Sequence, residues 1–204
     1  TVGSKSGADI REVPQSVSVV TRQRMDDQNF TSLQDAMKQT TGMLVQRYDG
    51  SGNFNAIYSR GYESDSLLLD GVTTSTHANM ATSMDVAIYD RLEVLRGPAG
   101  LFQGSGEPGA TINMVRKRPG MAFDVTGGAL VGSWDTYRGE GDVTVPLVES
   151  GRLRARFVAL RDERDSFIDI VGSDKSLGYG TVEMDLNEST TVAVGATYQN
   201  IDSV

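Results

Sequence analysis

The sequence predicts a small α+β domain in its first half and a sheet of about five long antiparallel strands in its second half. Residues 1–118 alternate short apolar runs with clusters of Gly, Asn, Asp and Ser, which are typical of turns. From residue 121 onward the pattern changes to a long two-residue periodicity. Charge changes at the same point, because residues 1–118 carry 12 Lys and Arg against 13 Asp and Glu, whereas residues 119–204 carry 7 against 14. We therefore expect two domains, 1–118 and 119–204.

Composition argues against several classes of function. The 204 residues include no Cys and one His, so a disulfide framework, a thiolate metal site and a His-based catalytic triad are all poor hypotheses. The net charge of −8 argues against a nucleic-acid partner. The longest apolar runs, such as Leu67–Leu69, are far shorter than the roughly 20 residues of a membrane-spanning helix. Because the chain has neither an initiator Met nor a signal peptide, we expect a processed chain or an excised piece.

The first half reads as about five short strands with two or three short helices. A β-branched run that ends at Val20 predicts a strand. Thr31 or Ser32 can cap a helix over 33–40, in which apolar residues recur at helical spacing before Gly42. Further elements are expected at these positions: strands at 43–45, 56–58, 67–69, 92–95 and 110–115, and a helix at 83–90.

Gly104, Gly106 and Gly109 spell the GxGxxG pattern of a dinucleotide-binding loop. That fingerprint requires a strand before the glycines and a helix after them, but the residues that follow, ATINMV, alternate like a strand. We interpret the pattern as a Gly-rich turn between strands. The competing hypothesis, a nucleotide-dependent enzyme, predicts that the chain binds NAD or ATP.

Five segments of the second half place apolar residues on one face and polar or charged residues on the other. In one of them Val182, Met184 and Leu186 oppose Thr181, Glu183 and Asp185. The segments run for about 10 to 12 residues, which exceeds the usual strand of about 5 to 6 and matches the roughly 9 to 11 that cross a bilayer at a tilt. A soluble antiparallel sheet with one solvent-exposed face also alternates apolar and polar residues, so a soluble sheet is an alternative interpretation.

The connections between the five strands and the unpaired edges of their sheet also bear on whether the strands belong to a transmembrane barrel. Tight turns such as SWDT and a long polar stretch from 162 to 176 suggest short turns on one side and longer loops on the other. Five strands cannot close a barrel of transmembrane type, and unpaired edges are not tolerated in lipid. We therefore expect the first five antiparallel strands of a transmembrane β-barrel, carried by a fragment of a longer chain.

Several motifs in a fixed order resemble the TonB-dependent outer-membrane receptors, specifically the ferric-siderophore branch that includes the coprogen and pyoverdine receptors. The motifs are REVPQSVSVVT near the start, YSRGY at 58–62, LLLDGV at 67–72 and YDRLEVLRGPAGLFQGSGEPGATINMVRKRP at 89–119, followed by GSWDTYRGE and PLVESGRLRARFVA. The resemblance implies an α+β plug domain, residues 1–118, inside a barrel of about 22 strands. The remaining residues would then be its first five strands.

The resemblance also implies a function, the uptake of a ferric siderophore across the bacterial outer membrane without covalent chemistry. No cofactor or protein-bound metal is implied, because the iron arrives already chelated. The implied partners are the ferric siderophore, outer-membrane lipid, and TonB acting with ExbB/ExbD through a box upstream of Thr1. The alternatives are a receptor for haem, cobalamin or an oligosaccharide, and a soluble plug-like binding module.

Two sets of site residues follow from the resemblance. Arg60, which matches the arginine of the family's SRG motif, is the strongest ligand-binding candidate, whereas Ala87 stands where a hydroxamate receptor has a ligand-facing Tyr. The full ligand-binding set is Arg60, Tyr62, Thr74, Ser75, His77 and Asn79. The set expected to contact the inner barrel wall is Arg91, Glu93, Arg96 and Arg116, with Glu140, Asp142, Glu183 and Asp185 as the available carboxylates.

Overall fold

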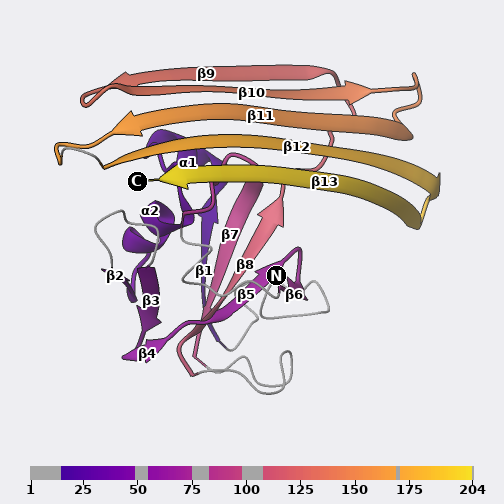
Figure 1. Cartoon of the computed structure of the whole chain (residues 1–204). Coiled ribbons are helices and arrows are strands. Elements are labelled where there is room, and N and C mark those ends of the chain that lie inside the picture. Colours follow the sequence, from indigo (N-terminus) through magenta and orange to yellow (C-terminus); the bar gives the residue numbers. More distant parts are fainter. Residues whose placement is uncertain (1–14, 49–54, 75–82, 98–107, 169–170, 204) are drawn as a thin grey trace. The chain divides into compact units, whose positions relative to one another are not determined.

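The computed structural model describes residues 15–48, 55–74, 83–97, 108–168 and 171–203 of the chain (Figure 1). The chain divides into two compact units, Thr1–Arg116 and Lys117–Val204. The structure thus places the boundary after Arg116, two residues before the boundary after residue 118 that composition predicted.

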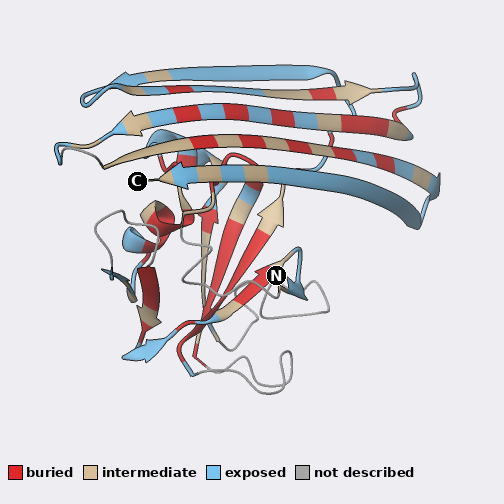
Figure 2. Ribbon diagram, viewed as in Figure 1, coloured by how far each residue is buried: buried red, intermediate tan, exposed pale blue. Residues whose placement is uncertain are grey.

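The first unit contains a five-stranded mixed sheet in the order β1-β7-β8-β5-β6. Strands β5 and β8 are parallel and the other pairs are antiparallel. Burial is concentrated along β7 and β8 (Figure 2), where Leu92, Val94 and Ile112 are fully buried. The strands are β1 (Ser16–Thr21), β5 (Ser66–Leu69), β6 (Val72–Thr73), β7 (Tyr89–Arg96) and β8 (Ala110–Arg116).

A second, three-stranded antiparallel sheet in the first unit has the order β2-β3-β4. Its strands are β2 (Met43–Arg47), β3 (Asn55–Ser59) and β4 (Tyr62–Glu63). The two-residue turn between β3 and β4 holds Arg60 and Gly61 at φ 54° and 86°. Positive φ at both central residues is the geometry of the tight hairpin turn that matches strand twist.

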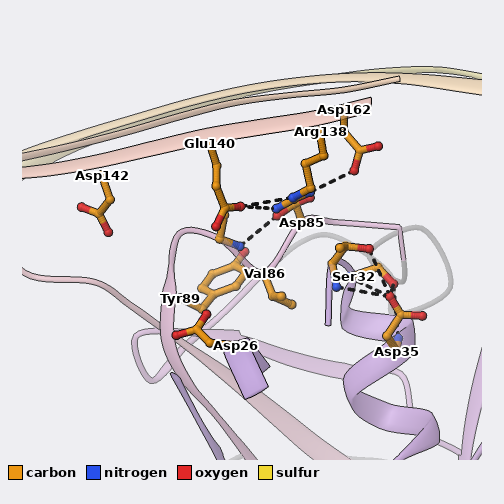
Figure 3. Close-up of polar contacts among 12 residues, drawn as sticks. Asp26, Ser32, Asp35, Asp85, Val86, Tyr89, Arg138, Glu140, Asp142 and Asp162 are labelled. Atoms are coloured by element: carbon orange, nitrogen blue, oxygen red, sulfur yellow. Dashed lines mark hydrogen bonds and ion pairs between the residues drawn. The ribbon is translucent and has the colours of Figure 1, made fainter. Parts of the chain in front are cut away.

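Two short helices, α1 (Arg22–Asp27) and α2 (Leu33–Lys38), belong to the first unit. The helix expected at 33–40 is confirmed as α2, which ends at Lys38, and Ser32 is its N-cap. The Ser32 Oγ accepts a hydrogen bond from the Asp35 N–H at 3.2 Å, and the Ser32 N–H donates to the Asp35 carboxylate at 3.1 Å, which makes a capping box (Figure 3). No helix among the described residues is long and apolar enough to cross a membrane.

The expected helix at 83–90 is wrong. Residues 83–88 form turns, and β7 begins at Tyr89. The backbone groups of this segment bond elsewhere, because the Met84 carbonyl accepts from the Leu33 N–H and the Val86 N–H donates to the Thr31 carbonyl. The Asp85 carboxylate accepts from the Ala87 N–H at 2.9 Å and fixes the turn locally. Helix α1 and strands β4 and β6 were not expected. The two strands have two residues each, which is too short to show a period.

The second unit is a five-stranded antiparallel sheet in the order β13-β12-β11-β10-β9, in which each strand pairs with the next along the chain. Its strands of 9 to 16 residues are β9 (Asp124–Gly132), β10 (Thr136–Pro146), β11 (Leu153–Asp165), β12 (Gly172–Asn187) and β13 (Thr190–Ser203). The expected five strands are confirmed, and their up-and-down order is that of the start of a barrel.

The two faces of this sheet differ as expected. Buried residues alternate with exposed ones along much of β11 and with half-buried or exposed ones along β12 (Figure 2). Val182 lies directly between Ala155 and Val194 on one face, and its neighbour Glu183 lies between Arg154 and Ala193 on the other. The large exposed side chains of the apolar face are Val125, Val131, Tyr137, Phe157, Val182, Met184, Leu186, Val192, Val194 and Tyr198.

The expected contrast between short turns and long loops is not found. Strand pairing continues through the polar residues on both sides of the supposed loop, from Asp162 opposite Lys175 to Asp165 opposite Gly172, which leaves only 166–171 as a connection. Ladder hydrogen bonds come from the backbone, so polar side chains do not end a strand. Each end of the sheet therefore has one shorter and one longer connection, 133–135 with 166–171 at one end and 188–189 with 147–152 at the other.

Candidate functional site

A hollow of roughly 380 Å³ opens on the three-stranded sheet of the first unit, beside the turn that carries Arg60. The pairing of β2 with β3 sets Leu44 directly opposite Tyr58. The hollow combines apolar, amide, phenol and guanidinium groups, which is the mixture expected of a site that orients a ligand by a few polar contacts. Its lining residues are Gly42, Met43, Leu44, Gln46, Tyr58, Arg60 and Gly61.

Arg60 approaches a second arginine, Arg96, which is hydrogen-bonded. A Cβ placed on Gly97 would lie 3.0 Å from Nη1 of Arg60. The adjacent Arg96 donates to the Thr41 carbonyl at 2.8 Å and to the Oγ of Ser18 at 2.6 Å. Burial, together with the charge of Arg60, lowers the pKa of Arg96.

Within the described part of the chain, the Arg60 guanidinium has neither a hydrogen bond nor an ion pair. Two neighbouring cations, one of them unbonded, create a positive potential that favours an anionic or oxygen-rich ligand.

A pair of phenols lies next to Arg60. The hydroxyl of Tyr58 is hydrogen-bonded to that of Tyr48, and this bond, with a smaller contribution from burial, raises the pKa of Tyr58 to about 12. Tyr58 is therefore protonated at physiological pH. Its hydroxyl supplies a neutral hydrogen-bonding group at the site rather than a second charge.

None of the other expected ligand-binding residues is among the described residues that line the hollow. Tyr62 is exposed on β4 and does not line the hollow. Thr74 follows β6, where its N–H donates to the Leu67 carbonyl at 3.0 Å. Ser75, His77 and Asn79 lie outside the described residues. Ligand binding by these residues stays a prediction.

The arginines and the glutamate expected to contact the barrel wall have partners inside the first unit. Arg91 donates to Glu93 at 2.9 Å and to Asp90 at 3.1 Å. Arg116 donates to Asp70 through both its backbone N–H, at 2.9 Å, and its Nε, at 2.6 Å. Together with the bonds of Arg96 described above, these contacts account for all four side chains locally. A role at the wall stays a prediction.

The polar face of the second unit carries ion pairs of its own. Arg138 donates to Asp162 at 2.9 Å and to Glu140 at 2.7 Å (Figure 3). Arg154 donates to Glu183 at 3.0 Å and to Asp185 at 2.6 Å. Arg156 donates to Asp142 at 2.7 Å, so the four carboxylates named as wall partners are all bonded to cations of their own sheet.

Two observations bear on metal and nucleotide binding. No group of three or more metal-ligating side chains occurs in the described ranges. Gly104 and Gly106 lie outside those ranges, but Gly109 is followed directly by β8, so a strand stands where a phosphate-binding loop needs a helix. A Cβ on Gly109 would lie 2.5 Å from the Glu63 carbonyl oxygen, which explains glycine at that position by close packing.

Sequence reasoning missed most of the hollow. It named Arg60 but not Leu44, Gln46 or Tyr58. The sequence contained part of the necessary information, because its pattern predicted strands at both 43–45 and 56–58. What was lacking was the pairing of those strands, which brings the side chains together.

Comparison with known proteins gives a consistent result. Residues 9–111 match the family model described as TonB-dependent Receptor Plug Domain. The chain is 43% identical over 199 residues to the ferric-pyoverdine 358 receptor of Pseudomonas putida, covering 96% of this chain and 24% of that protein. It is 45% identical over 197 residues to the ferripyoverdine receptor of Pseudomonas aeruginosa, covering 94% and 24%.

A solved structure shows the same relationship. The crystal structure of the Pseudomonas aeruginosa outer-membrane ferripyoverdine receptor bound to ferripyoverdine superimposes with a TM-score of 0.89 at 43% identity, covering 94% of this chain and 26% of that one. The chain therefore spans about a quarter of the length of the relatives that it matches.

Proposed function

The chain belongs to the TonB-dependent receptor plug domain family, and we propose that it forms the plug and the first barrel strands of a bacterial outer-membrane receptor that takes up a ferric siderophore. The observation that carries the proposal is the combination of a plug domain with an antiparallel sheet that has one apolar and one ion-paired face. A transmembrane barrel needs that alternation, because one face meets lipid and the other meets the polar interior. The plug ends between Arg116 and Arg118, and the strands after it belong to the barrel wall.

The cargo is a ferric chelate of the pyoverdine type. This part of the proposal is supported by the ferric-pyoverdine receptors among the relatives and by the unbonded guanidinium of Arg60 beside Arg96. Ferric siderophores present carbonyl and anionic oxygens, and an arginine recognises such groups through charge-assisted hydrogen bonds. Tyr62, Thr74, Ser75, His77 and Asn79 complete the proposed ligand-binding set on the plug.

Transport requires energy from outside the receptor. In the proposed mechanism TonB, acting with ExbB/ExbD, pulls on the plug, while the receptor itself catalyses no covalent reaction and carries no cofactor. The iron is cargo, held by the siderophore rather than by protein ligands.

The test compares two arginines of the same sheet in the complete receptor. Arg60→Ala removes the unbonded guanidinium from the hollow, whereas Arg47→Ala removes an exposed arginine at the end of β2 that does not line it. Loss of one hydrogen-bonding charged group costs about 1.5–3 kcal/mol, so Arg60→Ala is expected to weaken equilibrium binding of ferric pyoverdine roughly tenfold or more. Arg47→Ala is expected to bind like the wild type.

Several outcomes would overturn the assignment. Unchanged affinity in Arg60→Ala, or an equal loss in Arg47→Ala, removes Arg60 from the ligand site. Binding of haem, cobalamin or an oligosaccharide by the wild type, with no binding of any ferric siderophore, replaces the cargo.

A further inference from the structure

The border between the two units falls on a single peptide bond whose two sides are held by different carboxylates. Arg116 is the last residue of the first unit and Lys117 the first of the second. Arg116 is bonded to Asp70 within the first unit. Lys117 is bonded to Asp142 within the second. The junction, Arg116–Lys117, is therefore held by an ion pair on each side and is not a free linker.

On the side of the first unit, the junction is held by a weak, partly exposed ion pair. One carboxylate, that of Asp70, receives both the backbone N–H and the Nε of Arg116. The two side chains retain 30% and 37% of their exposure. An ion pair so open to water contributes about 0–1 kcal/mol, because solvent screens it.

The fastening on the second unit's side holds the main chain as well as the side chains. Lys117 donates to Asp142 at 2.8 Å, and its carbonyl accepts a bond from the Tyr179 hydroxyl at 2.8 Å. Arg118 donates to Glu183 at 2.6 Å, and its carbonyl accepts from Nη1 of Arg156 at 3.0 Å. Two consecutive residues are thus bonded to β10, β11 and β12 together.

The two carboxylates at this side are themselves fixed in place. Asp142 accepts from Arg156 at 2.8 and 2.7 Å, and Glu183 accepts from Arg154 at 3.0 Å. The Asp142 and Glu183 side chains are only 10% and 4% exposed, and that of Lys117 is 12% exposed, whereas Arg118 is 68% exposed. Removing one partner of such a pair leaves an uncompensated charge in a poorly solvated place, which costs far more than the loss of an exposed pair.

We propose that Asp142 and Glu183 are positioning residues that fasten the junction to the sheet of the second unit, so that a load on the first unit opens the Asp70–Arg116 pair while Lys117 and Arg118 stay in place. The proposal rests on the proposed function only in that TonB would supply the load. The junction therefore separates under load on the side of the first unit and stays bonded on the side of the second. Unfolding or displacement of the plug ends at Arg116 and does not propagate into β9.

An alternative account treats these ion pairs as simple charge neutralisation on a polar face. That account explains why arginines and carboxylates alternate across the strands. It does not explain why Tyr179 and Arg156 bond the carbonyls of Lys117 and Arg118, which carry no net charge. Bonds to the main chain resist peeling of the segment, which is the property that the proposal requires.

The test is force spectroscopy of the complete receptor in a lipid bilayer, pulled from the N-terminal end of the plug. The chain length released before the first barrel rupture is expected to end at Arg116 in the wild type. In Asp142→Asn/Glu183→Gln the release is expected to continue to the end of β9, adding about 55 Å at roughly 3.4 Å per residue. Glu163→Gln, a matched control, removes an exposed carboxylate of β11 that pairs with Arg161 and is expected to leave the end point unchanged.

A second variant keeps the proposal testable if the double variant fails to insert. Asp70→Asn is expected to lower the force of the plug rupture nearest the junction without moving the end point. Release beyond Lys117 in the wild type, or an unmoved end point in an inserted double variant, overturns the proposal. The measurement uses neither siderophore nor TonB, so a failure of the proposed function would show as lost iron uptake and leave this result unaffected.

Discussion

Glu93 and Asn113 face each other across β7 and β8, and the Asn113 side-chain amide donates a 3.1 Å hydrogen bond to the Glu93 carboxylate. The other oxygen of Glu93 accepts from Arg91, and the Asn113 carbonyl oxygen accepts from the Gly71 N–H at 2.8 Å. Because Glu93 is fully buried, these bonds form a polar chain through the sheet of the first unit. A buried network of this kind stabilises the fold only while every member has its partner.

The stability of the first unit should therefore depend on pH through Glu93. Burial alone would raise the pKa of Glu93, but the hydrogen bonds from Asn113 and Arg91 outweigh it and hold the pKa below its ordinary value. A carboxyl group whose folded pKa is depressed contributes stability above its unfolded pKa, and that contribution is lost as pH falls through the folded pKa. We expect faster hydrogen exchange of the β7 and β8 amides, corrected for intrinsic pH effects, as pH falls below about 4.5.

Glu93→Gln is the matched control for this dependence. It removes the titrating group and costs about 1–3 kcal/mol, because an amide cannot accept charge-assisted bonds on both sides. The variant should exchange faster at neutral pH and lose the acid dependence of β7 and β8. An acid dependence equal to that of the wild type would assign the effect to other groups.

The capping box of α2 provides a local test of helix stability. Ser32→Ala removes the side-chain oxygen that accepts from the Asp35 N–H and should destabilise the helix by about 1 kcal/mol. Amide exchange in α2 should then rise roughly fivefold, while exchange in β7 stays unchanged. Thr31→Ala, which removes the neighbouring hydroxyl that was the other candidate cap, should have a smaller effect.

These tests also show which features the sequence could predict. The faces of β12 follow from its sequence because successive side chains of a strand point to opposite sides, so Val182 and Glu183 were assigned correctly. Helix α2 was predicted because Ser32 marks its start and apolar residues recur at helical spacing after it, although the helix ends at Lys38, before the expected stop at Gly42. Both features depend on local geometry alone.

The errors arose where distant backbone decided the structure. Helical spacing within 83–90 was misleading, because backbone groups of that segment bond to Thr31 and Leu33 instead. The extent of β11 and β12 was underestimated, because pairing continues through charged residues. Similarly, Glu183 was noted as a carboxylate of the polar face, but only the strand register identifies Arg154 as its partner.

The apolar face of the second unit should not tolerate a charge. Val194 and Ala193 are adjacent on β13, and Val194 lies on the apolar face while Ala193 lies on the polar face opposite Glu183. Val194→Lys should destabilise the receptor in lipid bilayers by about 2–4 kcal/mol if the site lies near the bilayer midplane. Ala193→Lys should be tolerated, since its ammonium meets a carboxylate and water.

The measurement is the midpoint of guanidinium unfolding in vesicles for the two variants. Equal destabilisation would indicate that the two faces do not differ in their surroundings. Greater destabilisation by Ala193→Lys would reverse the assignment of the faces.

The central claim is transport, and uptake of radioactive iron measures it most directly. Cells that rely on the complete receptor for iron are given ferric pyoverdine labelled with radioactive iron, with and without TonB. The account predicts accumulation inside TonB-containing cells and binding without accumulation in cells that lack TonB. Equal accumulation in both, or neither binding nor accumulation, would contradict it.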